Sequence, residues 1–564
     1  MAKRMLEDTK SKKGRIIFNI IVAIIFLLLI AGIFYISPNY VKEDREGKIG
    51  ILINNNDVTL SMKKDIYKDE NNNIYLSRED VKNYFDKYIN YDEETGEIIT
   101  TSEINIARMH VGSNDISING VEDTLNSQVL EKNDTIYIPF SEISEKVYDV
   151  SLNYIESTDT IVIDSLDRKQ EKATITKNTN LKYKTTGFSR TLSKLKEGDE
   201  VIYIQDVEDW TQVRTKDGII GYVKNDVLDK KETVREDKEY VKKVDGKVNL
   251  VWDYYSEYVN APDRTNQTID GVNVVSPAFF SLETGSNGEI FDNCNEEGIR
   301  YIEWAHNNGY QVWAMFSNNS LRDTTSNILN DYEKREYMIQ NLLNLAEKYN
   351  IDGINVDFEN MNGEDKDLYS RFLIELSPQL RRAGKTLSVD VTAPDGSETW
   401  SLCFDRDTIA DVSDYIIFMA YDQHGPSSKK AGTVAGYNWV ETNIKKFLGQ
   451  EDVDAEKLIL GIPLYTRLWK ETNGEVDSDV VNMKDIQSEV PEGLVANWDD
   501  ELKQYYAEYE ENGSTYKIWV ENEKSVQEKI KLANNYKLAG IAFWEKDRET
   551  NDEFWTMVKE ELNK

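Results

Sequence analysis

Residues 352–359 read Asp-Gly-Ile-Asn-Val-Asp-Phe-Glu. Asn355, Asp357 and Glu359 alternate with apolar residues, so they share one face of a predicted β-strand. Two carboxylates two residues apart repel each other, which raises the proton affinity of one of them. A protonated acid beside an ionised carboxylate is what cleavage of a glycosidic bond requires. A polar rim, or a cation site that uses Asp352 and Asp357, would explain the same pattern.

Apolar runs of strand length recur on both sides of this stretch, with helical segments between them. The eight runs are Val248–Trp252, Val272–Val275, Val312–Phe316, Gly353–Phe358, Leu387–Val391, Tyr415–Tyr421, Leu458–Ile462 and Ile541–Trp544. Strands that alternate with helices from residue 245 to residue 564 predict an α/β fold, the (β/α)8 TIM barrel, with its site at the carboxyl ends of the strands. The stretch from Lys470 to about Tyr516 predicts an inserted subdomain beside that site.

The sequence of residues 352–359 resembles the DGxDxDxE signature of glycoside hydrolase family 18, the chitinase and endo-β-N-acetylglucosaminidase family. Three further matches lie in order at later strand ends. Met-Ala-Tyr-Asp at residues 419–422 is similar to the family's MxYD, and Gly-Ile-Pro-Leu-Tyr-Thr-Arg at residues 461–467 is similar to its GxPxYGR. Trp544 stands at the position of the aromatic floor under the bound sugar. The resemblance covers residues 245–564.

The resemblance implies substrate-assisted, retaining hydrolysis of a polymer that contains N-acetylglucosamine. Glu359 would protonate the leaving oxygen, Asp357 would orient the acetamido N–H, and Tyr421 would hold the acetamido oxygen that attacks C1. The candidate substrate-binding residues are Asn355, Asp422, Tyr465, Arg467, Trp544 and Asn318. Other candidates at strand ends, for which packing is an equal alternative, are Trp252, Asp253, Asp390, Gln423 and His424. No cofactor and no metal site is implied.

Two positions depart from the family pattern. Asn355 replaces the middle Asp of the signature; because that Asp shares a proton with the next one, Asn355 would mimic its neutral state and keep Asp357 ionised. The third strand ends Ala-Met-Phe-Ser-Asn at residues 314–318 instead of SxGG. Both departures resemble spore-cortex lytic N-acetylglucosaminidases, which favours peptidoglycan as the substrate. An inactive, lectin-like member is the alternative, but such members usually lose the acid, and Glu359 is present.

Composition excludes several other classes of protein. The chain has 564 residues with 67 Lys and Arg against 102 Asp and Glu, a net charge of −35. A protein with this much negative charge repels the phosphate groups of nucleic acids, which excludes nucleic acid as a partner. Cys294 and Cys403 cannot form a disulfide framework and are expected to be unpaired. The three histidines, with no HExxH motif, leave little room for histidine-based metal chemistry.

Residues 16–36 are apolar apart from Asn19, and a basic tail at residues 1–15 precedes them. Such a run crosses a hydrocarbon core of about 30 Å, which predicts a single transmembrane helix at the cell membrane. The excess of positive charge places the tail in the cytoplasm and the rest of the chain outside it. A cleaved signal peptide is the alternative, but the run exceeds the usual length of about 7–15 residues and no A-x-A site follows.

Two small modules are predicted between the membrane segment and the barrel. Residues 48–165 contain a weak repeat in which residues 74–76 correspond to residues 136–138. Each copy reads as a strand, a helix and a hairpin, and the pair resembles the N-terminal domain of copper amine oxidases. We interpret this module as a spacer or as a docking module for the wall or a protein.

The second module, residues 172–229, has short β-type runs with turn signals, and Trp210 lies among them. It resembles bacterial SH3-like domains, which would make wall peptides a possible partner; a structural barrel with a core Trp is the alternative. A charged linker at residues 230–244 would connect it to the barrel at residues 245–564.

The sequence thus predicts a membrane-anchored, extracytoplasmic β-N-acetylglucosaminidase that cleaves β-1,4 bonds of a polysaccharide, with peptidoglycan favoured. A non-catalytic glycan-binding or envelope- and spore-assembly scaffold is one alternative. A chitin-binding chitinase or a host-glycan endo-β-N-acetylglucosaminidase is the other.

Overall fold

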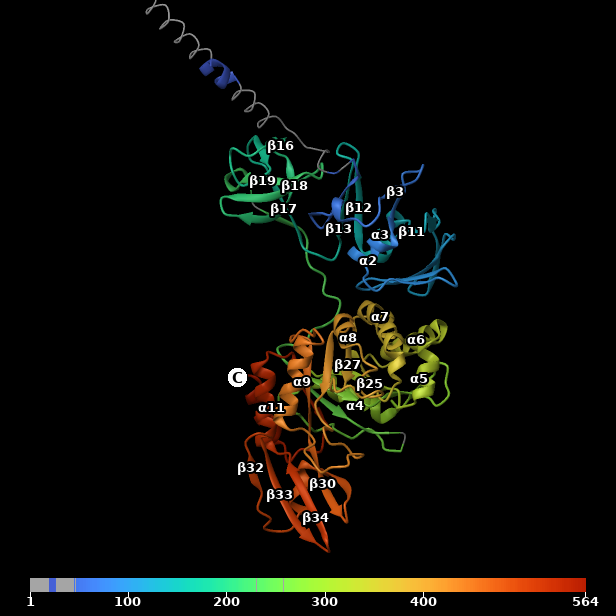
Figure 1. Cartoon of the computed structure of the whole chain (residues 1–564), viewed down its shortest axis with the longest axis vertical. Coiled ribbons are helices and arrows are strands. Elements are labelled where there is room, and N and C mark those ends of the chain that lie inside the picture. Colours follow the sequence, from blue (N-terminus) through green and yellow to red (C-terminus); the bar gives the residue numbers. More distant parts are fainter. Residues whose placement is uncertain (1–19, 27–44, 46, 230, 257) are drawn as a thin grey trace, which may run out of the picture. The chain divides into compact units, whose positions relative to one another are not determined.

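The computed structural model describes residues 20–26, 45, 47–229, 231–256 and 258–564. They form two compact units (Figure 1). The second consists of Tyr240–Lys564 together with Glu103–Asn105, and the first contains the other described residues up to Glu239. The predicted membrane helix at residues 16–36 lies outside the described residues, except for residues 20–26, which are helical. Within the described part of the chain, no helix is both long enough and apolar enough to cross a membrane.

The second unit is built on a closed ring of parallel strands. They are β21 (Val248–Asp253), β22 (Val274–Pro277), β25 (Gln311–Ser317), β26 (Gly353–Asp357), β27 (Thr386–Val391), β28 (Tyr415–Met419), β29 (Leu458–Pro463) and β35 (Gly540–Trp544). Strand β21 pairs with β22 and β35, and a β22–β25 pairing closes the ring. The predicted eight-stranded (β/α)8 barrel is therefore confirmed.

Amphipathic helices surround the ring. They are α4 (Glu296–Asn307), α5 (Arg322–Leu329), α6 (Tyr332–Lys348), α7 (Lys366–Arg382), α8 (Arg406–Val412), α9 (Tyr437–Gly449), α11 (Glu523–Asn535) and α12 (Glu553–Leu562). Helix α6 begins where the Asp331 side chain accepts two backbone N–H groups, and it buries Met338, Ile339 and Leu342. Inside the ring, Trp252 and Trp313 are fully buried, so the barrel is a packed core that leaves the site to the strand ends.

Two additions to the barrel build up its carboxyl end. The hairpin β23 (Phe280–Leu282) and β24 (Ile290–Asp292) follows β22, and β23 pairs with β25. The inserted subdomain is a sheet of β30 (Tyr465–Thr472), β31 (Glu475–Asn482), β32 (Asn497–Asp499), β33 (Gln504–Glu511) and β34 (Ser514–Val520), with the short helix α10 (Ile486–Glu489). The insertion was predicted, but it starts at Tyr465 rather than Lys470, because β30 follows β29 after a single residue.

A buried cation ties the end of the first strand to the loop after the last one. The Arg264 side chain is 1% exposed and contacts both Asp253 oxygens at 2.6 and 2.8 Å and Asp547 at 2.9 Å. Replacing Arg264 by Leu leaves Asp253 buried without its cation, so we expect the free energy of unfolding of the barrel to fall by about 3–5 kcal/mol in a denaturant titration.

The exposed pair Lys531–Glu528 provides the matched control for this ion pair. Lys531→Ala is expected to cost less than about 1 kcal/mol, because exposed pairs are screened by water and salt. An Arg264→Leu protein as stable as the parent would contradict the argument.

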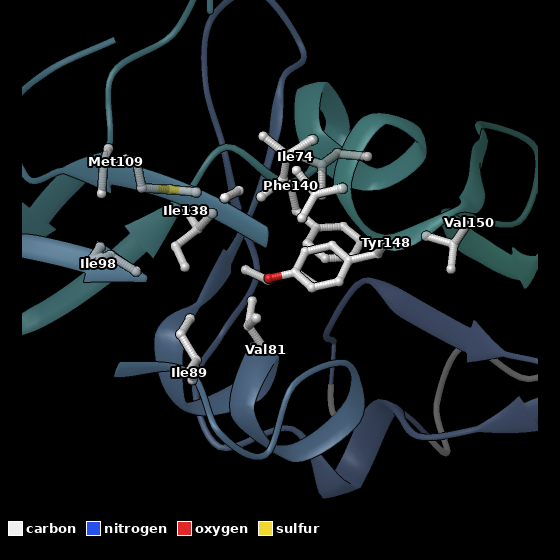
Figure 2. Close-up of a cluster of buried hydrophobic side chains, with 14 of the residues drawn as sticks. Ile74, Val81, Ile89, Ile98, Met109, Ile138, Phe140, Tyr148 and Val150 are labelled. Carbon is white, nitrogen blue, oxygen red and sulfur yellow. The ribbon is translucent and has the colours of Figure 1, made fainter. Parts of the chain in front are cut away.

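The first unit contains the predicted repeat. Its elements are β1 (Gly50–Ile53), β2 (Asn56–Asp57), β3 (Tyr67–Lys68), β4 (Ile74–Ser77), α2 (Arg78–Tyr84), β5 (Asn90–Asp92), β6 (Glu97–Thr101), β7 (Ile106–His110), β8 (Asp115–Ile118), β9 (Val121–Thr124), β10 (Leu130–Lys132), β11 (Thr135–Ile138), α3 (Phe140–Tyr148), β12 (Val150–Ile155) and β13 (Thr160–Ser165). The set β4, α2, β5 and β6 corresponds to β11, α3, β12 and β13. Both copies share one core, in which Val81 of α2 faces Phe140 and Tyr148 of α3 (Figure 2).

A seven-stranded sheet of the first unit follows, with β14 (Gln170–Thr174), β15 (Thr179–Lys182), β16 (Thr191–Leu195), β17 (Glu200–Val207), β18 (Trp210–Thr215), β19 (Ile220–Lys224) and β20 (Glu232–Arg235). Its strands are antiparallel, and Leu181, Val201 and Val213 lie in its core. Trp210 is buried. Strand β20, which pairs with β14, lies in the segment predicted as a linker. The resemblance to SH3-like domains stays a prediction.

Candidate active site

The backbone of Glu359, just beyond β26, is held by one side chain. Asn318 Oδ1 accepts the Glu359 N–H at 3.0 Å, and Asn318 Nδ2 donates to the Glu359 carbonyl at 2.9 Å. The Asn318 amide also contacts the Thr325 hydroxyl and the Ser320 N–H, and it is fully buried. These bonds use the whole amide, so Asn318, which we expected to bind substrate, is placed to position Glu359 instead.

Asp357 is the last residue of β26 and lines an open cleft. Its Oδ1 is buried and has no hydrogen-bond partner in the described part of the chain. Burial and the neighbouring charge of Asp390 raise the pKa of Asp357 well above the usual range of an aspartate. These surroundings favour uptake of a proton by Asp357, and the expectation that Asn355 keeps it ionised stays a prediction.

The side chain of Asn355 bonds to residues of three other strands. Its side chain is fully buried, and its Oδ1 accepts from Trp252 Nε1 at 2.8 Å and from Ser276 Oγ at 3.1 Å. An indole nitrogen only donates, so the amide NH₂ faces the other way. There it donates to Asp390 Oδ1 at 2.8 Å and to Ser388 Oγ at 3.2 Å. Asn355 thus supports a carboxyl group on β27, and its polar atoms are taken by the protein rather than left for a substrate.

A second polar cluster forms where β28 ends and β30 begins. The Tyr465 hydroxyl donates to Asp422 Oδ1 at 2.7 Å, and the ring centroids of Tyr421 and Tyr465 are 6.3 Å apart. Burial raises the pKa of Tyr421 well above the usual range, so its hydroxyl keeps its proton and can donate it in a hydrogen bond. Arg467 is buried and donates to Ser478 at 2.8 Å. Burial raises the pKa of Asp422, and the Tyr465 hydroxyl and the Arg467 charge offset only part of that rise.

A cleft of about 390 Å³ opens beside Asp357 and Trp544. Trp544 ends β35, and its ring centroid is 6.0 Å from that of Tyr254. Tyr258 on the same loop and Phe280 of β23 also line the cleft. These aromatic residues lining the cleft, apart from Trp544, were not predicted from the sequence. The signal that could have found them is the cluster of three tyrosines directly after the first strand, an aromatic surface of the kind that stacks on sugar rings.

The fold brings the predicted catalytic residues together. Asp357 and Asp422 both raise the pKa of Glu359, and Glu359 and Asp357 both raise that of Tyr421. Two of the other candidates at strand ends interact with groups of the protein itself. Asp253 is bound by Arg264, and the His424 ring lies 3.0 Å from the carbonyl of residue 433. Cys294 and Cys403 are buried and unpaired.

Residues 250–549, which are more than half of the chain, match the family model of glycosyl hydrolases family 18. The chain belongs to glycosyl hydrolases family 18. It is therefore a glycoside hydrolase. Residues 52–163 match the copper amine oxidase N-terminal domain, which confirms that resemblance.

Relatives of this family 18 chain come from spore-forming bacteria among others. The uncharacterized glycosylase YvbX of Bacillus subtilis (strain 168) is 26% identical over 51% of this chain and 84% of its own length. The cortical fragment-lytic enzyme of Bacillus anthracis is 26% identical over 47% of this chain and 63% of its own length, so the match spans less than two thirds of that relative. The crystal structure of a chitinase from Chromobacterium violaceum has 25% identity and a TM-score of 0.50, covering 57% of this chain and 100% of the chitinase.

The proton on Glu359 sets the alkaline limit expected for this family 18 enzyme. Burial and the charges of Asp357 and Asp422 raise the pKa of Glu359 to about 8. A general acid must be protonated, so we expect kcat/KM to be retained below that pH and to fall as one proton is lost around it. A pH profile with a fluorogenic N-acetylglucosamine oligomer measures this. A fall near pH ~4.3, the ordinary value for a glutamate, would contradict it.

Proposed function

We propose that this chain cleaves the β-1,4 bond that follows an N-acetylglucosamine residue in peptidoglycan, by substrate-assisted retaining catalysis. The observation that carries the proposal is the pairing of Asp357 with Glu359. Asp357 has a buried oxygen with no hydrogen-bond partner in the described chain, and Glu359 is a carboxyl group whose pKa is about 8. A buried acceptor of this kind fits a substrate N–H group.

The first half-reaction opens the glycosidic bond. Glu359 gives its proton to the leaving oxygen, while the acetamido oxygen of the same sugar attacks C1 and forms an oxazolinium ring. Asp357 Oδ1 accepts the acetamido N–H, and the Tyr421 hydroxyl donates to the acetamido oxygen. The carboxylate form of Asp357 would stabilise the positive charge of the ring. In the second half-reaction, ionised Glu359 takes a proton from water, which opens the ring with retained configuration.

Three observations support the substrate and the setting. A relative that shares the barrel is a cortical fragment-lytic enzyme, a name that points to spore-wall glycan. Tyr254, Tyr258 and Trp544 give the cleft aromatic surfaces for sugar rings. The apolar run at residues 16–36 supports a membrane-anchored enzyme with the barrel outside the cytoplasm.

The test uses the full chain, solubilised in mild detergent and incubated with purified peptidoglycan and with chitin oligosaccharides. Mass spectrometry of the products is expected to show new reducing N-acetylglucosamine ends from peptidoglycan, absent with Glu359→Gln. Cleavage of the chitin oligosaccharides alone would assign the enzyme to chitin, the substrate class of the Chromobacterium enzyme. Cleavage of neither polymer by a folded chain would overturn the catalytic proposal in favour of a binding role.

A further inference from the structure

Apart from the basic tail at residues 1–15, one short part of this acidic chain is rich in positive charge. Residues 172–196 contain seven Lys or Arg residues and no Asp or Glu, whereas the whole chain carries a net charge of −35. The remainder therefore carries −35 − 7 = −42. Long-range electrostatics alone would drive so acidic a protein away from an anionic surface. Charges on different modules are screened from one another beyond a Debye length of about 8 Å, so a local basic patch can act independently.

Most of this segment is a hairpin at the edge of its sheet. It consists of β15, the loop at residues 183–190 and β16, which we call the basic hairpin. Strand β16 is one of the two edge strands of the sheet, and β20 is the other. The loop is exposed from residue 183 to residue 188, with Tyr183 53% exposed and Phe188 93% exposed. A large apolar side chain this open to solvent at the tip of a hairpin has no packing role in the unit.

The cations of the basic hairpin are not neutralised by carboxylates. Lys172 and Lys177, before the hairpin, pair with Glu200 and Asp226. Four residues of the hairpin itself have no carboxylate within ion-pair distance among the described residues: Lys182, Lys184, Arg190 and Lys194. The Arg190 guanidinium and the Lys184 ammonium group lie 5.4 and 5.9 Å from the centroid of the Tyr183 ring, so cations and aromatic rings gather at one tip.

We propose that the basic hairpin docks on an anionic phospholipid surface. Its cations would contact lipid phosphates while Phe188 enters the boundary between head groups and acyl chains. A soluble polyanion would satisfy the cations but gives Phe188 no apolar environment, which is why the lipid surface is the better fit. The length of the connecting segment agrees with docking on a membrane. Residues 37–46, which follow the predicted membrane helix, can span at most about 35 Å, so the first unit would stay near the bilayer.

The experiment places a probe at the tip of the hairpin in the full chain. Phe188→Cys is labelled with an environment-sensitive nitrobenzoxadiazole dye and reconstituted into phosphatidylcholine vesicles, with or without phosphatidylglycerol. The native cysteines do not compete, because burial raises the pKa of Cys294 to about 12 and that of Cys403 to about 11. Insertion of an N-terminal helix is common to both kinds of vesicle, so a difference between them reports on the hairpin.

We expect a blue shift of the dye only in vesicles that contain phosphatidylglycerol, and its loss at high salt. Lys184→Gln combined with Lys194→Gln should raise the fraction of anionic lipid needed for half the shift, corresponding to roughly thirtyfold weaker binding. The matched control is Val121→Cys on β9, which is also exposed, at 68%, but lies next to acidic residues, where no shift is expected.

Two results would overturn the proposal. Identical spectra in neutral and anionic vesicles would show that the hairpin does not recognise the lipid charge. A response to soluble poly(glycerol phosphate) in the absence of any response to vesicles would assign the hairpin to a wall polymer instead. Two controls separate either result from misfolding. Each labelled chain should unfold at the same temperature as the unlabelled parent, and the salt titration is also run on the labelled chain that keeps both lysines.

Discussion

Replacing Glu359 by Gln is expected to lower the turnover number about 10²- to 10⁴-fold, because the amide has no proton to give to the leaving oxygen. Binding of uncleaved oligosaccharide should change little, since the side chain keeps its size and the Asn318 clamp acts on the backbone. Thermal stability should be equal or slightly higher. The raised pKa of Glu359 shows that the fold disfavours a charge at this position, and the amide cannot ionise.

The control for this substitution is Glu364→Gln, an exposed glutamate shortly after the site, which should leave turnover unchanged. Turnover is measured by release of reducing ends, and binding by calorimetry with an N-acetylglucosamine oligomer. If Glu359→Gln kept most of the activity, the proton would have to come from another group, and Asp422 would be the first to examine. If the variant lost binding as well as turnover, Glu359 would be a binding residue rather than the acid.

Replacing Asn355 by Asp is expected to destabilise the barrel by about 3 kcal/mol at neutral pH. The new carboxyl group would lie where the amide now donates to Asp390 Oδ1 at 2.8 Å, and two buried carboxylates in contact cannot both ionise. One of them must have a pKa far above its value in the unfolded chain. The destabilisation is therefore absent below about pH 4 and grows as the pH rises.

The combined change Asn355→Asp with Asp390→Asn provides the decisive comparison. It restores one amide and one carboxyl group with their positions exchanged, so most of the lost stability should return. Denaturant titrations at about pH 4 and pH 7 for the parent, both single variants and the double variant give the coupling free energy. A single Asn355→Asp variant with no pH-dependent loss of stability would show that the two side chains do not interact as the geometry requires.

The barrel could be predicted because its strands are covered on both faces and therefore read as continuous apolar runs. The polar face of residues 353–359 was equally visible, since alternation within one strand needs no knowledge of its neighbours. The partners of Asn355 were not visible. Trp252 and Asp390 come from other strands, 103 and 35 residues away, and only the register between strands decides that they meet. Asn318 was found as a residue of the site, but its part in holding Glu359 was not.

The remaining differences have local causes. The insertion was placed five residues late because β30 begins one residue after β29, with no turn signal between the two strands. The hairpin β23–β24 was missed because its two strands have three residues each, too short for a periodic pattern. The small repeat could be predicted because both copies have their apolar residues at the same spacing. These residues pack into one shared core.

Asn318 also has a consequence for the timing of the reaction. In the proposed mechanism, Glu359 acts twice on one substrate, first giving up a proton and later taking one from water. The clamp by Asn318 holds the N–H and the carbonyl of Glu359, and neither changes when the carboxyl group gains or loses its proton. The backbone of Glu359 is therefore expected to keep one position between the two half-reactions, so that no loop has to move. How long the intermediate lasts should depend on how fast the released sugar leaves and water arrives, and not on a movement of the protein.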